Sequence, residues 1–126
     1  MPRVSVSMLK GKSGSYREGV LKSIYAALRE SLNVPEGDHF MTITEHESSN
    51  FLYGNAFDAT RSDDLLYISI TVFDSRNAEQ KANLFKSIAK HLKNAPGVSS
   101  EDVFVNLYPV SAENWSVARG LPFNQN

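Results

Sequence analysis

The chain has 126 residues, of which 41% are hydrophobic and 21% charged, the composition of a folded domain rather than of a disordered segment. Its net charge of -1 excludes non-specific nucleic-acid binding as the main function, and the absence of cysteine excludes disulfides, thiolate metal sites and cysteine nucleophiles. No apolar run approaches the roughly 20 residues of a membrane helix and no secretory leader is visible, so we expect no membrane partner and a cytoplasmic location.

The first predicted unit, residues 2–46, has the pattern strand, helix, strand. Apolar residues alternate with polar ones at its start, which predicts a strand through Val4, Val6 and Met8. Ser15 and Glu18 have the spacing of a capping box and place the start of a helix there. One helical face is apolar, at Val20, Leu21, Ile24, Leu28 and Leu32. Residues 33–37 contain a proline and a glycine that end the helix, and alternation over 40–45 predicts the second strand.

A linker over residues 47–64 follows, too long for a simple turn. Four large apolar side chains predict that it packs against the rest of the chain: Phe51, Leu52, Tyr53 and Phe57.

The second unit, residues 65–109, repeats the first at a constant offset of 64 positions without a gap: Val4 falls on Ile68, Leu28 on Leu92 and Asp38 on Asp102. Its predicted strands are residues 65–72 and 103–108. Its helix spans about 77–94, with Asn77 and Gln80 as a cap and a Pro-Gly pair at its end. Residues 110–126 form a C-terminal segment with turn signals at Gly120 and Pro122.

A strand–helix–strand unit of this size joins parallel strands by a right-handed crossover. Two units predict an α+β, two-layer fold in which a four-stranded mixed sheet carries both helices on one face. We expect residues 1–126 to form one domain of this kind. The other sheet face would stay bare and apolar, so the pattern predicts an oligomer that packs this face inward.

Pro2 is the first candidate for chemistry. Methionine aminopeptidases remove Met1 before proline, and this would leave a secondary amine at the start of a core strand. A free α-amine has a pKa of about 8, and burial or a neighbouring cation would lower that pKa and create a general base. The alternative is that Pro2 is a strand-edge residue that hinders proteolysis.

Arg76 and Asp38 are the next candidates. Arg76 lies between strand and helix, where a guanidinium can bind a carboxylate with two parallel hydrogen bonds; alternatively it is a solvated arginine beside Asp74. Asp38 opens the second strand and is suited to activating water or a hydroxyl. The same position in the second unit is Asp102, which favours a structural turn role for both.

Two other signals are weak. Residues 11–13, Gly-Lys-Ser, lack the leading glycine of a phosphate loop. His39, His46 and His91 do not have the spacing of metal ligands, so no metal and no cofactor is predicted.

Together these features resemble the tautomerase superfamily, most closely the branch that includes malonate semialdehyde decarboxylase. The resemblance covers nearly the whole chain. It depends on Pro2, on the duplicated unit, and on four local runs at residues 34–38, 61–63, 76–81 and 114–116.

The resemblance implies a homotrimer of βαβ repeats with the amino-terminal proline, here Pro2, as acid or base. Arg76 matches an arginine that binds the substrate carboxylate, and Asp38 matches an aspartate that assists decarboxylation or hydration. Trp115 resembles part of the pocket wall. The decarboxylase pattern Arg-Pro-Arg is replaced here by Asp74-Ser75-Arg76, so the first arginine is missing.

We therefore predict a cofactor-free keto–enol tautomerase that acts on a small carboxylated substrate, such as a 2-oxo acid or an arylpyruvate. Pro2, Asp38 and Arg76 are the predicted catalytic residues, and Arg76 and Trp115 the predicted substrate-binding residues. One alternative is a decarboxylase or hydratase in which Asp38 activates water. The other is a non-catalytic trimer that binds a partner protein.

Overall fold

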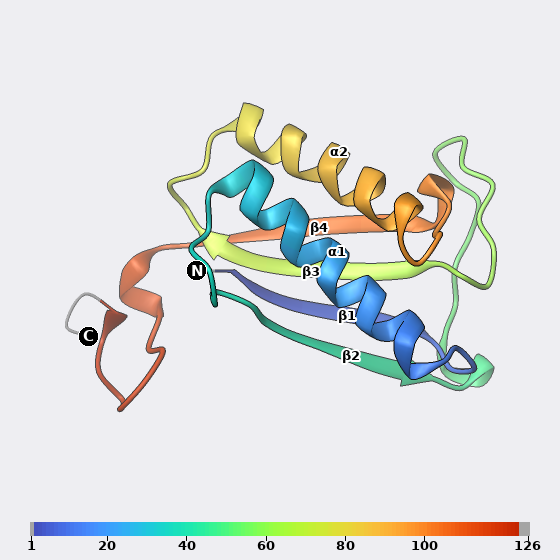
Figure 1. The fold of residues 1–126 in the computed structure, drawn as a ribbon, viewed down its shortest axis with the longest axis horizontal. Coiled ribbons are helices and arrows are strands. Elements are labelled where there is room, and N and C mark those ends of the chain that lie inside the picture. Colours follow the sequence, from blue (N-terminus) through green and yellow to red (C-terminus); the bar gives the residue numbers. More distant parts are fainter. Residues whose placement is uncertain (1, 124–126) are drawn as a thin grey trace.

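The computed structural model describes residues 2–123 (Figure 1). Four strands and two helices form the chain in the order β1 (Arg3–Leu9), α1 (Gly14–Leu32), β2 (Phe40–His46), β3 (Leu66–Phe73), α2 (Ala78–Asn94) and β4 (Val103–Val110). Three short 3-10 segments lie at Ser48–Asn50, Ser100–Asp102 and Ala112–Asn114. Both helices begin at positions related by the offset of 64, as the sequence repeat predicts.

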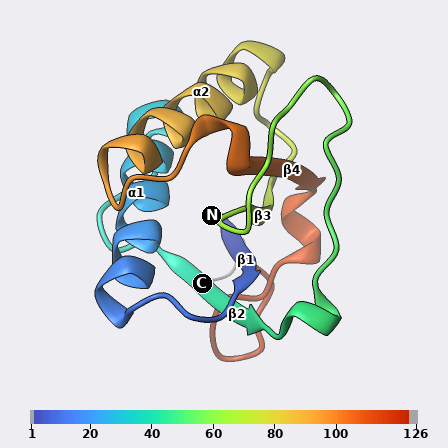
Figure 2. The same ribbon diagram turned by 90° about the vertical axis from the view of Figure 1, so that its right-hand side faces the viewer.

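The strands form one mixed sheet in the order β2-β1-β3-β4. β1 is parallel to β2 and β3 is parallel to β4, because each helix returns the chain to the same end of the sheet. β1 and β3 are antiparallel and join the two repeats at the centre. Figure 2 shows both helices on one side of the sheet, which confirms the predicted fold class.

The core lies between the sheet and the helices. Alternate residues of the central strands face it and are buried: Val4, Val6, Met8, Leu66, Ile68, Ile70 and Val72. The helices contribute Val20, Ile24, Leu28, Leu84, Ile88 and Leu92. Period-two burial in the strands and helical spacing in α1 and α2 therefore meet in one layer.

The open face of the sheet differs from the expectation of a bare apolar surface. Its middle carries small hydroxyl side chains: Ser5, Ser7, Thr42, Thr44, Ser69 and Thr71. Large apolar groups on this face include Phe40, Phe104 and Tyr108, which are exposed. The expectation is wrong for the middle of this face, because Val4, Val6, Met8, Ile68, Ile70 and Val72 turn toward the helices.

The two helix starts had different outcomes. At α2, Asn77 Oδ1 accepts a hydrogen bond from the Gln80 amide, and Gln80 Oε1 accepts one from the Asn77 amide. The predicted capping box is therefore confirmed. In α1 the cap is Ser13, whose hydroxyl oxygen accepts a hydrogen bond from the Tyr16 amide at 3.1 Å. The Ser15–Glu18 prediction was therefore wrong, because Ser13 satisfies the free amides one residue before Gly14 begins the helix.

The linker packs only in part against the sheet. The ring of Phe51 contacts that of Tyr67 at 5.3 Å between centroids. Leu52 and Phe57, which were also expected to pack, are each 89% exposed. Within residues 2–123, neither helix is long and apolar enough to cross a membrane.

Candidate functional site

The register of the sheet places the candidate residues at one end of the molecule. Arg3 pairs with Phe40 in the parallel neighbour β2. Pro2, just before Arg3, is therefore level with the residues that lead into β2, among them Asp38. The backbone amide of Asp38 donates to the Pro35 carbonyl at 3.1 Å, which closes the turn after α1.

The other central strand brings in the remaining candidates. β3 is antiparallel to β1, with Arg3 opposite Thr71, so β3 ends where β1 begins and Arg76 follows directly. β4 runs parallel to β3 and ends beside it at Val110, shortly before Trp115. In Figure 1 this end of the sheet holds the N-terminus, the end of α1, the start of α2 and the C-terminal segment.

Pro2 and Arg76 line the same cleft. Pro2 is buried, and the cleft is completed by Leu32, Val34, Val72 and Phe73; it is a narrow recess without room for a water molecule. These four side chains are apolar, so Arg76 is the one charged residue among those that line the recess. Pro2 is an amine only after Met1 has been removed, and Met1 lies outside the described residues.

Among the described residues, the guanidinium of Arg76 has one hydrogen bond. Its Nη1 donates to the Leu32 carbonyl at 2.7 Å. Its Nε is buried and has no hydrogen-bond partner within residues 2–123. The alternative was a solvated arginine beside Asp74; Arg76 is instead half-buried and bound to Leu32, while Asp74 is exposed. A buried donor of a charged group without a partner is costly, and an incoming carboxylate would satisfy it.

Trp115 also shares a pocket with Pro2. A second pocket of about 170 Å³ is lined by Pro2, Arg3, Phe40, Trp115, Ser116 and Val117. The indole of Trp115 packs edge-on against Phe73, 5.6 Å between centroids, and its Nε1 is buried without a partner in the described part of the chain. Phe40 and Val117 were not predicted for this site, because their positions give no signal beyond that of ordinary strand and tail residues.

The two equivalent aspartates have different surroundings. Asp102 is 3% exposed and accepts two hydrogen bonds from Ser62, from the amide at 2.7 Å and from the hydroxyl at 2.6 Å. It fixes the linker where the chain enters β3, a structural role. Asp38 is half-buried and lies at the Pro2 end of the sheet.

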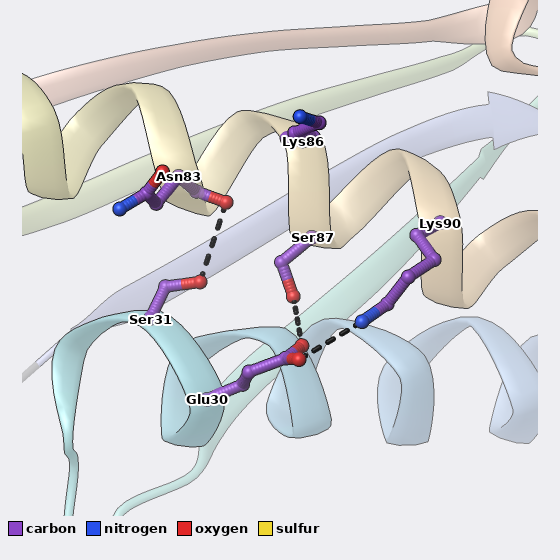
Figure 3. Close-up of a pocket in the computed structure, with 6 residues that line it drawn as sticks. All are labelled: Glu30, Ser31, Asn83, Lys86, Ser87 and Lys90. Atoms are coloured by element: carbon purple, nitrogen blue, oxygen red, sulfur yellow. Dashed lines mark hydrogen bonds and ion pairs between the residues drawn. The ribbon is translucent and has the colours of Figure 1, made fainter.

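A groove of about 360 Å³ lies between the outer surfaces of α1 and α2 (Figure 3), on the helix layer of the molecule, and includes neither Pro2 nor Arg76. Its polar groups bind one another: the Glu30 carboxylate accepts from Ser87 at 2.5 Å and from Lys90 at 2.9 Å. The groove is therefore a polar contact between the helices rather than a substrate site. No group of three or more His, Asp or Glu side chains within residues 2–123 is placed to hold a metal ion.

Comparison with known proteins identifies the family of the chain. The family model described as "Tautomerase enzyme" matches residues 38–118. "Probable tautomerase YusQ" of Bacillus subtilis (strain 168) is 36% identical over 121 residues, which are 95% of each chain.

Solved structures share the fold. Malonate semialdehyde decarboxylase superposes with a TM-score of 0.91 at 23% identity, over 98% of this chain and 96% of that one. A symmetric trimer of fused 4-OT superposes with a TM-score of 0.80 at 19% identity, over 96% and 95% of the two chains. Since the family model covers more than half of the sequence and YusQ aligns over nearly all of it, the chain belongs to the tautomerase family and is an enzyme of that type.

Proposed function

We propose that this enzyme is a cofactor-free keto–enol tautomerase whose substrate is a 2-oxo acid of the arylpyruvate type. The observation that carries the proposal is that Pro2 and Arg76 line the same narrow recess at the end of the sheet. A proton-transfer group and a carboxylate-binding group on one cleft are what the interconversion of an enol and its keto form needs.

In the proposed mechanism the Pro2 nitrogen, freed by removal of Met1, takes a proton from the carbon next to the carbonyl. The C–H electron pair becomes a C=C bond and the carbonyl oxygen takes the negative charge and then a proton. Ketonisation is the reverse. Burial of Pro2 and the cation of Arg76 both disfavour the ammonium form, so we expect the pKa of the Pro2 amine to lie below its usual value.

The pocket beside Trp115 supports an aryl or similar apolar group in the substrate. Its volume of about 170 Å³ is close to that of cavities of about 150 Å³ that bind benzene in protein interiors. The carboxylate would bind Arg76 on one side of Pro2 while the ring occupies this pocket on the other. An acid at position 74, where the decarboxylase pattern has an arginine, favours a substrate that needs a single cation.

The test is the rate of phenylpyruvate enol–keto exchange, after the intact mass has shown that Met1 is absent. We expect Pro2→Ala to lower the rate by about 10²–10⁴-fold, the usual contribution of a positioned acid or base. A parent rate no higher than that of Pro2→Ala would overturn the proposal.

A decarboxylase or hydratase activity is the second candidate. It is favoured by Asp38 at the Pro2 end of the sheet and by the likeness to malonate semialdehyde decarboxylase, a protein described with decarboxylase and hydratase activities. Asp38→Asn should then abolish decarboxylation of malonate semialdehyde and leave phenylpyruvate exchange intact. Equal loss of both reactions would contradict a separate role for Asp38.

We also propose that the chain assembles as a homotrimer. The fused 4-OT of the same fold is a symmetric trimer, and the exposed Leu52, Phe57 and Tyr108 are side chains that other copies would cover. Sedimentation should give about three times the chain mass of 14.0 kDa. A mass equal to that of one chain at micromolar concentration would contradict this assembly.

A further inference from the structure

The end of helix α1 holds the side chain of Arg76. Leu32 is the last residue of α1, and its carbonyl accepts the hydrogen bond from Arg76 Nη1 at 2.7 Å. The last carbonyls of a helix have no partner within the helix and carry a partial negative charge, so a guanidinium is favoured there. The first repeat thus supplies the support for a cation that belongs to the second.

This bond determines which edge of the guanidinium can bind a ligand. Arginine presents its donors in a rigid planar fork, so fixing Nη1 on Leu32 also fixes the direction of the Nε–Nη2 edge. Nε is the donor that is buried without a partner within residues 2–123. A carboxylate that bridges Nε and Nη2 from the side would satisfy it with two parallel hydrogen bonds.

The direction of the Leu32 carbonyl depends in turn on Asn33. Asn33 follows α1 in the left-handed conformation, with φ 54° and ψ 35°. Asparagine and glycine adopt this conformation more easily than other residues, and β-branched residues adopt it with strain. The equivalent position in the second repeat is Gly97, with φ 105°.

We propose that Asn33 is a positioning residue for substrate binding: its left-handed turn holds the Leu32 carbonyl on Arg76 Nη1 and leaves the Nε–Nη2 edge to bind the carboxylate. The inference deepens the proposed function, since it assigns how the carboxylate of the substrate is recognised. It assigns two roles to the Arg76 side chain: Nη1 binds the end of α1, and the buried Nε, which has no partner within residues 2–123, is left for the carboxylate.

The experiment compares an acid with a neutral analogue. The kcat/KM of phenylpyruvate and of its methyl ester is measured for the parent, for Asn33→Val and for Asn33→Gly. We expect Asn33→Val to lower kcat/KM for the acid by about tenfold, mainly through KM, and to change the ester little. Asn33→Gly, which keeps a positive φ without strain, should retain the acid preference of the parent.

Gly97→Val is the matched control. It places the same β-branched residue at the position that the repeat aligns with Asn33. An added Cβ there meets no atom within 4 Å, and the turn follows α2 rather than α1, the helix whose last carbonyl binds Arg76. It should lower stability as Asn33→Val does and leave the acid-to-ester ratio unchanged. A ratio that Asn33→Val does not change, or that Gly97→Val changes equally, would overturn the positioning role. If Asn33→Val does not fold, Asn33→Ala is measured in its place by the same criterion.

A binding readout separates this inference from the proposed reaction. The ¹⁵N–¹H signal of Arg76 Nε, assigned with Arg76→Lys, is followed during titration with the unreactive acid 3-phenylpropanoate. We expect a downfield shift that is weakened in Asn33→Val. No shift at saturation overturns the side-on carboxylate. A shift in a protein whose exchange rate does not depend on Pro2 would overturn the reaction and leave the positioning role standing.

Discussion

The two strand–helix–strand repeats have the same elements at the same spacing, yet their strand-to-helix junctions differ. Lys12 stands in the first repeat where Arg76 stands in the second. The Lys12 ammonium forms an ion pair with Asp64 at 2.8 Å, and this hydrogen bond raises the pKa of Lys12. Arg76 instead contacts a backbone carbonyl and keeps a buried donor without a partner in the described chain.

The turns before the last strand of each repeat differ in the opposite direction: here the side chain of the second repeat is the one with the described internal bonds. In the second repeat, Asp102 is buried and holds Ser62 with both carboxylate oxygens. In the first repeat, the equivalent Asp38 is half-buried beside the start of β1. Each repeat thus serves as the structural reference for the other, and at this position the two repeats differ in how deeply the carboxylate is buried.

The largest contrast is expected between Arg76 and Lys12. Arg76→Ala should lower kcat/KM for phenylpyruvate by about 10²-fold, because it removes a charge-assisted, bidentate contact worth about 1.5–3 kcal/mol. Lys12→Ala removes an exposed ion pair worth at most about 1 kcal/mol of stability and should leave kcat/KM within about twofold. Steady-state kinetics on both variants tests the contrast, and equal losses would show that the two junctions do not differ in function.

A smaller effect, on stability, is expected from Asp102. Asp102→Ala removes the acceptor of two hydrogen bonds and leaves the Ser62 amide without its partner, so we expect a loss of about 1–3 kcal/mol in the free energy of unfolding. Asp38→Ala should cost less, because that side chain is more exposed. Urea denaturation of both variants measures the difference. A greater loss for Asp38→Ala would mean that the first repeat, too, uses this position to hold its fold.

The sequence repeat predicted the mixed sheet, both helices and the capping box at Asn77, because apolar periodicity and local caps are encoded in neighbouring residues. Residue chemistry indicated Pro2, Asp38 and Arg76 as candidates, and the resemblance to the tautomerase superfamily added Trp115. The Leu32 carbonyl and the left-handed Asn33 could not be found in this way. A backbone acceptor has no residue type, and its use by Arg76 depends on how the end of α1 meets the end of β3.

The polar open face was missed for a related reason. Alternation in a strand separates its residues into two faces but does not say which face the helices cover. The apolar strand residues could therefore be expected on either face. The exposed Leu52 and Phe57 show the same limit, since an apolar linker residue can pack on its own sheet or on another copy.

The smallest expected effect concerns Glu30, whose side chain links the helices of the two repeats. The equivalent position in the second repeat is Asn94, which is not acidic. The carboxylate of Glu30 accepts hydrogen bonds from Lys90, Ser87 and His91, and these lower its pKa to about 2 from 4.5. Because the folded-state pKa lies below the unfolded one, the stabilisation is complete above about pH 4.5 and is lost as pH falls toward 2.

Glu30→Gln should therefore reduce the free energy of unfolding at pH 6. The difference in this free energy between variant and parent should shrink as pH falls from about 4.5 to 2. Glu18→Gln, an exposed acid on the same helix, is the matched control and should show no such convergence. Urea denaturation across this pH range measures both. Because the contact lies on the outer surface of the helices, Glu30→Gln should leave the acid-to-ester ratio of the parent unchanged. A changed ratio would mean that the packing of α1 on α2 governs the position of the Leu32 carbonyl, and the two repeats would then be coupled through their helices as well as at Arg76.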